Sequence, residues 1–313
     1  MRVAVAVDLG ATKIAFALVS ESGQVLERAR VATQSDDGGA RVAERVAEES
    51  ARLIDRARGQ GLEVAGVGIG SAGVISPEGT VLNAANAMKD WSGTPLGAIV
   101  AERTGVRCGV VNDCHAHAMG EGWLGSTAHA ETSLLVAVGT GVGGGYVQNG
   151  KVLQGACGVA GHVGHFSSLF AAGLDCPCGG VEHVEAVAAG PGIVRAFHRA
   201  GGSSQVADVQ GVAECAAGGD TAAIQAIELG ARALGVALAD LANILNPHAI
   251  VLAGGVVNLG ERWLSTVREE FIARALAECR STPITLAALG QDAPLFGAAR
   301  WILRPDDSSL DPR

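Results

Sequence analysis

Residues 8–13, Asp-Leu-Gly-Ala-Thr-Lys, follow an apolar run and could hold a phosphate. Gly10 allows a ligand to approach the backbone closely, and the Thr12 hydroxyl can donate to phosphate oxygens. Asp8 can hold the water shell of Mg²⁺, an ion that takes only one or two carboxylates. Lys13 could add positive charge, although a surface lysine fits equally well. A plain hairpin turn is the structural alternative for the whole segment.

Residues 139–145, Gly-Thr-Gly-Val-Gly-Gly-Gly, form a second candidate segment with five glycines in seven positions. Such a backbone can cradle an anion in its N–H groups, and Gly139, Thr140, Gly141 and Gly143 are the candidates. We expect a strand to follow, so the segment is not a dinucleotide-binding fingerprint. It is not a Walker loop either, because it lacks a Gly-Lys-Ser/Thr sequence. The alternative is a flexible glycine hairpin.

Gly254 and Gly255 follow the apolar run 249–253 and form a third segment. Small residues between a strand and a helix let a flat ring lie on the backbone. Considered alone, however, these two glycines favour ordinary close packing of a strand and a helix.

Asp113 follows the short apolar run 109–111 and is predicted to open a helix. This places its carboxylate at the carboxyl end of a strand, where α/β proteins bind ligands. A carboxylate there can accept a proton from a hydroxyl that attacks phosphorus. Considered alone, the residue favours a simpler role as a helix N-cap.

A group of soft metal ligands interrupts the pattern between residues 155 and 185. His165, Cys176 and Cys178 offer the imidazole and thiolates that zinc prefers. The other five of the seven cysteines are scattered, which indicates reduced thiols rather than a disulfide framework. The alternative is an empty site with two reduced cysteines.

The elements that must position these residues alternate between strands and helices. We expect strands at 3–7, 14–19, 25–31, 64–69, 109–111, 132–138, 146–152, 249–253 and 284–288. We expect helices at 40–58, 96–104, 113–123, 191–200, 206–217, 219–245, 260–279 and 294–303. A strand, a Gly-Thr turn and a second strand occur near residue 8 and again near residue 139. This weak internal repeat predicts two related α/β halves that face each other across a cleft.

Composition sets wider limits. The 313 residues suggest about two domains, and 48% hydrophobic with 18% charged residues excludes a disordered, highly charged chain. A net charge of −9 without a basic cluster argues against binding nucleic acid. No apolar run reaches the ~20 residues of a membrane span, and no secretory leader is evident. We therefore expect a cytoplasmic location and no membrane partner.

Together, the segments at 8–13, 139–145 and 254–255 resemble the phosphate-1, phosphate-2 and adenosine segments of the actin-like ATPase fold, which includes sugar kinases. Residues 111–121, 155–165 and 176–180 further resemble the ROK family (repressors, open reading frames and kinases). The resemblance extends over residues 3–302, with the motifs in the family's order. It implies an α/β protein of two RNase H-like domains flanking a cleft. The family's repressors add an N-terminal helix-turn-helix, which we do not expect here.

The resemblance also implies two domains with different functions and a tail. A sugar-binding and phosphate-1 domain would span residues 1–122, and the helix near 293–303 would pack back onto it. A nucleotide-binding domain with the metal motif would span 123–303, followed by a disordered tail at 304–313. ATP and Mg²⁺ would be held by Asp8, Gly10, Thr12, Lys13, Gly139, Thr140, Gly141, Gly143, Gly254 and Gly255. Relatives are often dimers or tetramers, so we expect a homodimer or homotetramer.

In the family, the segment that matches 111–121 is catalytic, so the resemblance makes Asp113 the general base for phosphoryl transfer. It implies sugar contacts from Gly73, Asn86, Asn112, His162, His165 and Glu185. The family's third cysteine is here His183, which is also a metal ligand type. The resemblance therefore implies a structural Zn²⁺ site of His165, Cys176, Cys178 and His183.

Two residues depart from the family pattern. His162 replaces a glutamate that helps bind the sugar around C1 and C2, and His115 replaces a common asparagine. We predict an ATP-dependent hexose kinase that phosphorylates the 6-hydroxyl, with glucose as the first choice. The alternatives are a kinase of a modified hexose, such as kanosamine or an N-acylmannosamine, or of a C7-cyclitol. A non-catalytic sugar-sensing regulator is a further alternative, and polyphosphate is an alternative donor.

Overall fold

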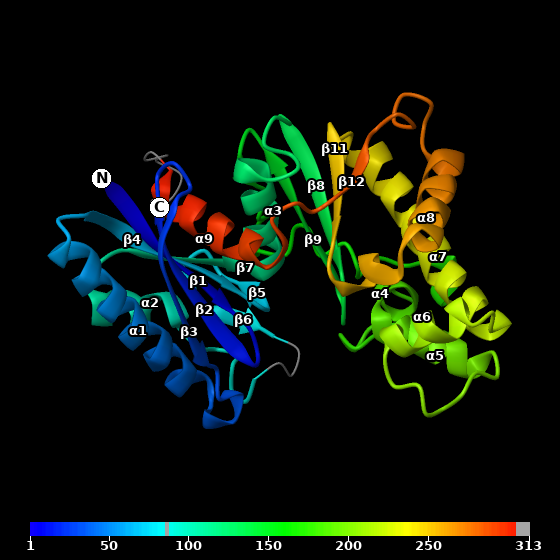
Figure 1. Cartoon of the computed structure of the whole chain (residues 1–313), viewed down its shortest axis with the longest axis horizontal. Helices are drawn as coiled ribbons and strands as arrows, with labels where there is room; N and C mark the ends of the chain where they lie inside the picture. Colours follow the sequence, from blue (N-terminus) through cyan, green and yellow to red (C-terminus); the bar gives the residue numbers. More distant parts are fainter. Residues whose placement is uncertain (85–87, 305–313) are drawn as a thin grey trace. The chain divides into compact units, whose positions relative to one another are not determined.

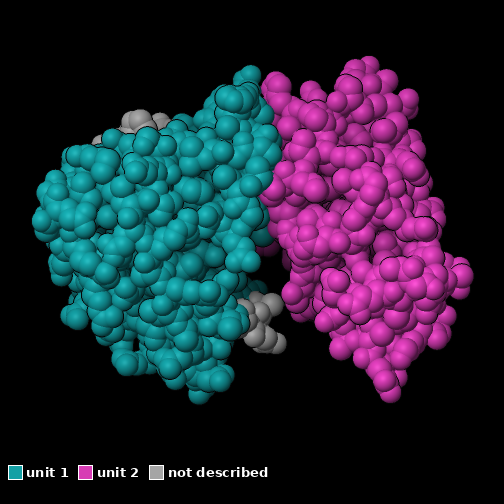
Figure 2. Space-filling view, viewed as in Figure 1, with its two compact units in different colours: residues 1–131, 145–161, 288–313 teal, residues 132–144, 162–287 magenta. Residues whose placement is uncertain are grey.

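The computed structural model describes residues 1–84 and 88–304, which fall into two compact units. Unit 1 contains residues 1–131, 145–161 and those from 288 onward, and unit 2 contains 132–144 and 162–287 (Figure 2). Asn86 and nearly all of the predicted tail lie outside the described residues. The division into a sugar-binding and a nucleotide-binding domain stays a prediction.

Unit 1 is built on a five-stranded sheet of order β3-β2-β1-β4-β7 (Figure 1). Its strands are β1 (Arg2–Leu9), β2 (Lys13–Ser20), β3 (Val25–Ala32), β4 (Glu63–Ser71) and β7 (Cys108–Asn112). The first three form an antiparallel meander, whereas β4 runs parallel to both β1 and β7. The carboxyl ends of β1, β4 and β7 therefore meet at one edge of the sheet.

The two faces of this sheet are covered by different helices because successive side chains of a strand point to opposite sides. Val5 and Val7 of β1 pack with α1 (Gly39–Gly59) and α2 (Leu96–Thr104). Ala4 and Ala6 pack with α9 (Ala293–Leu303) on the other face. The alanines leave room for a helix to approach this second face closely.

Glycines bring α9 into backbone contact with α3 (Asp113–Leu124). A Cβ atom at Gly297 would lie 1.6 Å from the Ala116 carbonyl oxygen, and one at Gly120 would lie 2.1 Å from the Ala293 oxygen. Only glycine fits such distances. This packing fixes the helix that begins at Asp113.

The second sheet has the order β10-β9-β8-β11-β12, which corresponds strand for strand to the first. Its strands are β8 (Thr132–Val138), β9 (Val142–Gln148), β10 (Lys151–Val152), β11 (Ala249–Ala253) and β12 (Ile284–Leu286). β11 is parallel to both β8 and β12. The matching orders confirm the internal repeat expected from the sequence.

The helices of unit 2 follow the long 162–185 segment. They are α4 (Glu185–Ala188), α5 (Gly190–Arg199), α6 (Val209–Ala217), α7 (Thr221–Leu245) and α8 (Glu261–Arg274). Asp220 caps α7 by accepting hydrogen bonds from the N–H groups of Ala222 and Ala223. Among the described residues, α7 is the single helix long and apolar enough to cross a membrane, and 61% of its most apolar window is buried within the protein. That burial is typical of a core helix.

Three short pieces differ from the predictions. The strand expected at 146–152 is a hairpin of β9 and β10, because Asn149 and Gly150 turn with φ values of 50° and 69°. The helix expected at 260–279 ends at Arg274, since Ala275 has an extended ψ of 146°. The hairpin of β5 (Val74–Ile75) and β6 (Val81–Asn83) was not predicted.

Candidate active site and metal-ligand cluster

Asp113 lies at the junction of β7 and α3, at the carboxyl edge of the first sheet. The N-cap of α3 is Asn112, whose Oδ1 accepts hydrogen bonds from the N–H groups of Cys114 at 2.9 Å and His115 at 3.3 Å. The N-cap is therefore Asn112 and not Asp113, although Asp113 Oδ1 also accepts a hydrogen bond from the Cys114 N–H at 2.9 Å. The Asn112 Nδ2 also donates to the Gly73 carbonyl oxygen at 3.0 Å, which holds the loop after β4 against this helix turn.

Asp8 provides a second carboxylate at the same edge. It lies in β1 opposite Gly70 of β4, which in turn lies opposite Val111 of β7. Burial and, to a smaller extent, the negative charge of Asp113 raise the pKa of Asp8 to about 6, against the opposing effect of Lys13. Two carboxylates whose charges interact in a largely buried site are suited to bind a metal ion and to accept a proton.

Hydrogen bonds fix the turn between β1 and β2. The Gly10 N–H donates to the Lys13 carbonyl oxygen at 3.1 Å, and the Thr33 hydroxyl donates to the Gly10 oxygen at 2.6 Å. The side chain of Thr12 is exposed at the tip of the turn. The Lys13 ammonium donates to Gln291 Oε1 at 3.2 Å. The turn therefore presents a fixed backbone together with one accessible hydroxyl.

The glycine turn of unit 2 is held by neighbours from α4 and α5. The Gly139 N–H donates to the Gly141 oxygen, and the Gly190 N–H donates to the Gly139 oxygen, both at 2.8 Å. Glu185 Oε2 accepts from the Val142 N–H at 2.8 Å. Glu185, predicted as a sugar ligand, thus touches the predicted phosphate-2 segment, a contact that the sequence did not reveal.

Gly254 continues β11 into the 3₁₀ helix Gly255–Leu259. Its φ is 88°, and a Cβ atom there would lie 2.3 Å from the Val138 oxygen at the end of β8. Both facts require glycine at this position. The third glycine segment therefore packs directly against the end of the strand that leads into the second.

His165, Cys176, Cys178 and His183 form a compact cluster in unit 2, with ligand atoms all within 4.8 Å of one another. The Cys178 Sγ to His183 Nδ1 distance is 3.3 Å, and the Cys176 Sγ to His165 Nδ1 distance is 3.8 Å. Zinc bonds of about 2.0–2.3 Å in a tetrahedron place neighbouring ligand atoms about 3.3–3.8 Å apart. These residues therefore fit a zinc ion in both donor chemistry and spacing.

A tight turn shapes this cluster. The Cys176 N–H donates to the Gly180 oxygen at 2.9 Å, which closes the turn 176–180 that carries both cysteines. A Cβ atom at Gly180 would lie 2.5 Å from the His183 ring, so a larger residue would displace that ligand. Burial raises the pKa of the Cys176 thiol to about 12. Metal binding must therefore release a proton from this thiol.

The predicted site residues divide between the two units. Unit 1 holds Asp8, Gly10, Thr12, Lys13, Gly73, Asn112 and Asp113. Unit 2 holds Gly139, Thr140, Gly141, Gly143, His162, His165, Cys176, Cys178, His183, Glu185, Gly254 and Gly255. The ring of His162 stacks at 6.2 Å from that of His165, which places it beside the cluster.

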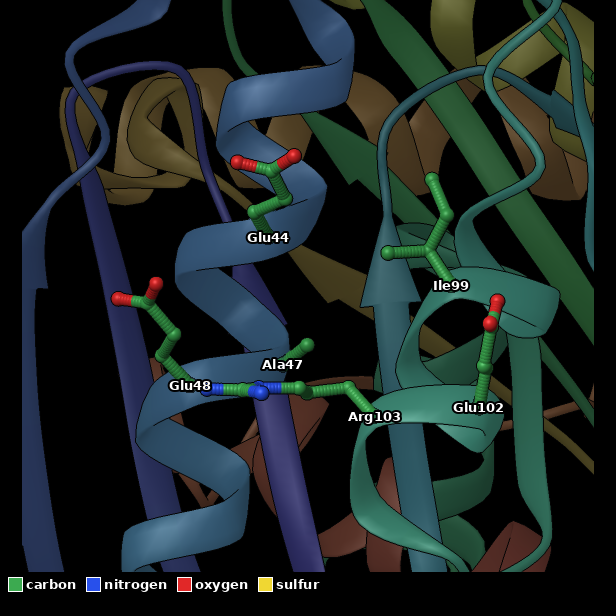
Figure 3. A pocket seen from close by; sticks show the side chains of 6 residues that line it. All are labelled: Glu44, Ala47, Glu48, Ile99, Glu102 and Arg103. Atoms are coloured by element: carbon green, nitrogen blue, oxygen red, sulfur yellow. The ribbon is translucent and has the colours of Figure 1, made fainter.

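A surface hollow of about 450 Å³ lies elsewhere on unit 1, between α1 and α2 (Figure 3). Glu44 and Glu48 of α1 line it together with Glu102 of α2, and Figure 3 shows Arg103 extending from α2 towards α1. None of the predicted site residues that the structure describes lines this hollow.

Comparisons with known proteins agree over nearly the whole chain. Residues 4–304 match the ROK family model. A glucokinase from Halalkalibacterium halodurans is 32% identical, with 98% of this chain and 96% of the relative covered. An N-acetylmannosamine kinase from Haemophilus influenzae is also 32% identical, with 95% and 94% covered.

Solved structures give the same result. A ROK hexokinase from Thermus thermophilus has a TM-score of 0.84 at 32% identity, with 95% of this chain and 97% of that chain covered. A ROK family glucokinase from Streptomyces griseus, in complex with glucose and AMPPNP, has a TM-score of 0.73 at 31% identity, with 96% and 99% covered. The α/β fold of this chain is thus that of the actin-like ATPases, and the chain belongs to the ROK family.

Proposed function

We propose that this protein is an ATP-dependent hexose kinase that phosphorylates the 6-hydroxyl, with glucose as its first substrate. The observation that carries the proposal is the pair of carboxylates, Asp8 and Asp113, at one edge of the first sheet in a chain similar to glucokinases along its whole length. Sugar-kinase chemistry needs one carboxylate for the hydroxyl proton and another for the metal that accompanies ATP.

Asp113 is the general base in this mechanism. Its carboxylate takes the proton of the 6-hydroxyl while the oxygen forms a bond to the γ-phosphorus. The bond between that phosphorus and the β–γ bridging oxygen breaks, and ADP leaves with the electron pair. Asn112 keeps Asp113 in place by capping the helix and by holding the loop at Gly73.

The residues that would hold Mg·ATP come from segments in both units. Asp8 would hold the water shell of Mg²⁺, which neutralises phosphate charge when it is bound. Gly10, Thr12 and Lys13 would contact some of the ATP phosphates through backbone and side-chain donors. On unit 2, the predicted contacts are Gly139, Thr140, Gly141, Gly143, Gly254 and Gly255.

The cluster of His165, Cys176, Cys178 and His183 would hold a structural Zn²⁺, which supplies no chemistry to the transfer itself. Its effect would be to order the loop that carries His165 and leads into Glu185. Both residues are proposed hexose ligands, together with Gly73, Asn112 and His162. An imidazole or carboxylate can bond one or two sugar hydroxyls when its position is fixed.

A kinase of a modified hexose is the second candidate, and His162 favours it. A neutral imidazole accepts one hydrogen bond and donates another, whereas the glutamate expected there only accepts. The similarity to an N-acetylmannosamine kinase fits a substrate altered near C2. A non-catalytic sugar sensor is disfavoured because Asp113 and both glycine segments are retained.

Location and assembly follow from the same proposal. We expect a cytoplasmic homodimer or homotetramer without a nucleic-acid or membrane partner. Size-exclusion chromatography with light scattering measures the assembly, and a monomer across the micromolar range would contradict it.

The test of the function is ADP release with Mg·ATP against a panel of acceptors. The panel holds glucose, mannose, glucosamine, kanosamine, N-acetylmannosamine, N-acetylglucosamine, allose and a C7-cyclitol, with polyphosphate as a second donor. We expect the highest kcat/KM with glucose. One strongly preferred modified sugar would favour the second candidate, and no turnover with any acceptor would contradict the kinase assignment.

A further inference from the structure

His115 is buried three residues beyond Asn112, the N-cap of α3, and its side chain takes no part in that cap. It is 1% exposed. Its ring nitrogen Nε2 lies 2.6 Å from the carbonyl oxygen of Ala160. Because a carbonyl oxygen can only accept, Nε2 must carry the hydrogen and donate it. This bond ties α3 to a segment 45 residues away along the chain.

The segment that His115 holds is a loop, residues 153–161, with little regular structure of its own. The Ala160 N–H donates to the Gln154 oxygen at 3.0 Å, which closes the loop on itself. Gly158 has a φ of 75°, and a Cβ atom there would lie 2.3 Å from the Ile75 oxygen. The loop therefore packs its backbone directly against β5.

The loop at 71–75 is held by the same helix turn. Asn112 donates to the Gly73 oxygen at 3.0 Å, two residues before the backbone group that Gly158 contacts. The first turn of α3 thus holds one loop through Asn112 and the other through His115. The two loops also contact each other, and Asp113 stands between their two anchors in the sequence.

We propose that His115 is a positioning residue that sets hexose affinity by fixing the 153–161 loop against the Gly73 loop beside Asp113. This inference rests on the proposed function, because it assigns the hexose to the region around Gly73 and Asp113. His115 touches neither the sugar nor the reacting atoms. Its effect passes through the backbone of Ala160, which precedes the proposed sugar ligand His162 by two residues.

The donated hydrogen bond is the essential feature, so the test separates the bond from the volume of the side chain. His115→Gln places an amide N–H near the position of Nε2 and keeps the donor. His115→Phe keeps a ring but removes the donor, which leaves the partly buried Ala160 oxygen without this partner. His129→Phe is the matched control, because His129 is an exposed histidine of the same unit.

Two readouts are measured for each variant. Steady-state kinetics give KM for glucose and for ATP separately, and titration calorimetry gives glucose affinity without ATP. We expect His115→Phe to raise KM and Kd for glucose roughly tenfold, as for loss of one hydrogen bond, with KM for ATP unchanged. His115→Gln should restore most of the affinity, and His129→Phe should match the wild type.

Equal glucose affinity in all variants would overturn the proposal, as would equal losses in the Gln and Phe variants. A parallel rise of both KM values would also overturn it, because a general disturbance of the fold would then explain the loss. If His115→Phe does not fold, the Gln variant must still retain near wild-type glucose affinity. Wild-type protein that binds glucose without turnover would contradict the kinase assignment and still leave the His115 comparison measurable by calorimetry.

Discussion

The two sheets share one strand order, yet they carry different chemistry at their strand ends. Asp8 is the penultimate residue of β1 and lies opposite Gly70 of β4. Ala137 holds the same place in β8, opposite Ala253 of β11. The first sheet thus ends in carboxylates, whereas the second ends in small residues and glycine turns. Under the proposed function, the first half would carry the proton and metal chemistry, and the second half would allow a ligand to approach the backbone closely.

Among the described residues, only the first half carries a buried carboxylate whose ionisation destabilises the folded state. Ionised Asp8 is buried near Asp113, and its pKa is raised to about 6. No such charge is needed where the second half offers backbone N–H groups and glycines. Unit 2 instead concentrates its titratable groups in the 162–185 segment, where thiols and imidazoles can share a metal ion.

The largest effect should come from Asp113→Asn. The amide keeps the size of the side chain but cannot take the hydroxyl proton, so kcat should fall by about 10²- to 10⁴-fold. Glucose affinity measured by calorimetry should change little. Turnover close to wild type would remove Asp113 from the mechanism, and Asp55→Asn on the exposed surface of α1 is the control.

Asp8→Asn should weaken activity but strengthen the fold. The pKa of Asp8 rises from 3.8 to about 6 on folding, so the ionised group destabilises the folded state at pH 7 by up to ~3 kcal/mol. That penalty disappears as the pH falls through 6 towards 3.8, because folded Asp8 then binds a proton that the unfolded chain releases. Urea denaturation should therefore show the variant to be more stable than wild type at pH 7, with a smaller difference at pH 5.

The control for this experiment is again Asp55→Asn, which should shift stability equally little at both pH values. An Asp8→Asn variant that is less stable at pH 7 would show that Asp8 makes stabilising contacts and would contradict the cost assigned to the first half.

Metal removal tests the second half. Purified protein should contain zinc, and chelation should lower the melting temperature and weaken glucose binding. A metal at a hundred times its Kd stabilises a protein by about 2.7 kcal/mol, so chelation should lower the free energy of unfolding by about that amount. Cys178→Ser should lose the metal, whereas Cys157→Ser, at an exposed cysteine outside the cluster, should keep it. Full metal content in Cys178→Ser would contradict the proposed ligand set.

The smallest effect should come from a surface ion pair in the first half. Arg28 of β3 donates to both carboxylate oxygens of Asp292 at 2.7 and 2.9 Å, next to the start of α9. The two side chains are 50% and 42% exposed, so solvent screens the pair. Arg28→Ala should cost at most about 1 kcal/mol, and less in high salt. A larger loss in a double-mutant cycle with Asp292→Ala would show that this pair anchors α9.

Local patterns were enough to predict most elements of the fold. Apolar runs located β1, β8 and β11, and the 3.6-residue period located α2 to the residue. The β9–β10 hairpin was missed because a run of glycines hides where a strand begins. The Asn149-Gly150 turn, which follows the glycine run by four residues, is a strong hairpin signal that went unused.

The site could be predicted only in part, because its contacts join distant residues. Ligand chemistry suggested three metal ligands, and the family resemblance added His183 as the fourth. A bridge between Ser167 and His183 is what returns the chain to the cluster. Nothing local indicated that Glu185 would accept a hydrogen bond from Val142, or that His115 would reach Ala160. Long-range packing decides such contacts, and sequence periodicity does not report it.

The most direct test is to identify the product of wild-type protein with glucose and Mg·ATP by ³¹P NMR. The account predicts glucose 6-phosphate and ADP in equal amounts, with neither formed at a comparable rate by Asp113→Asn. ADP with free phosphate but no sugar phosphate, or an undiminished rate in the variant, would contradict it.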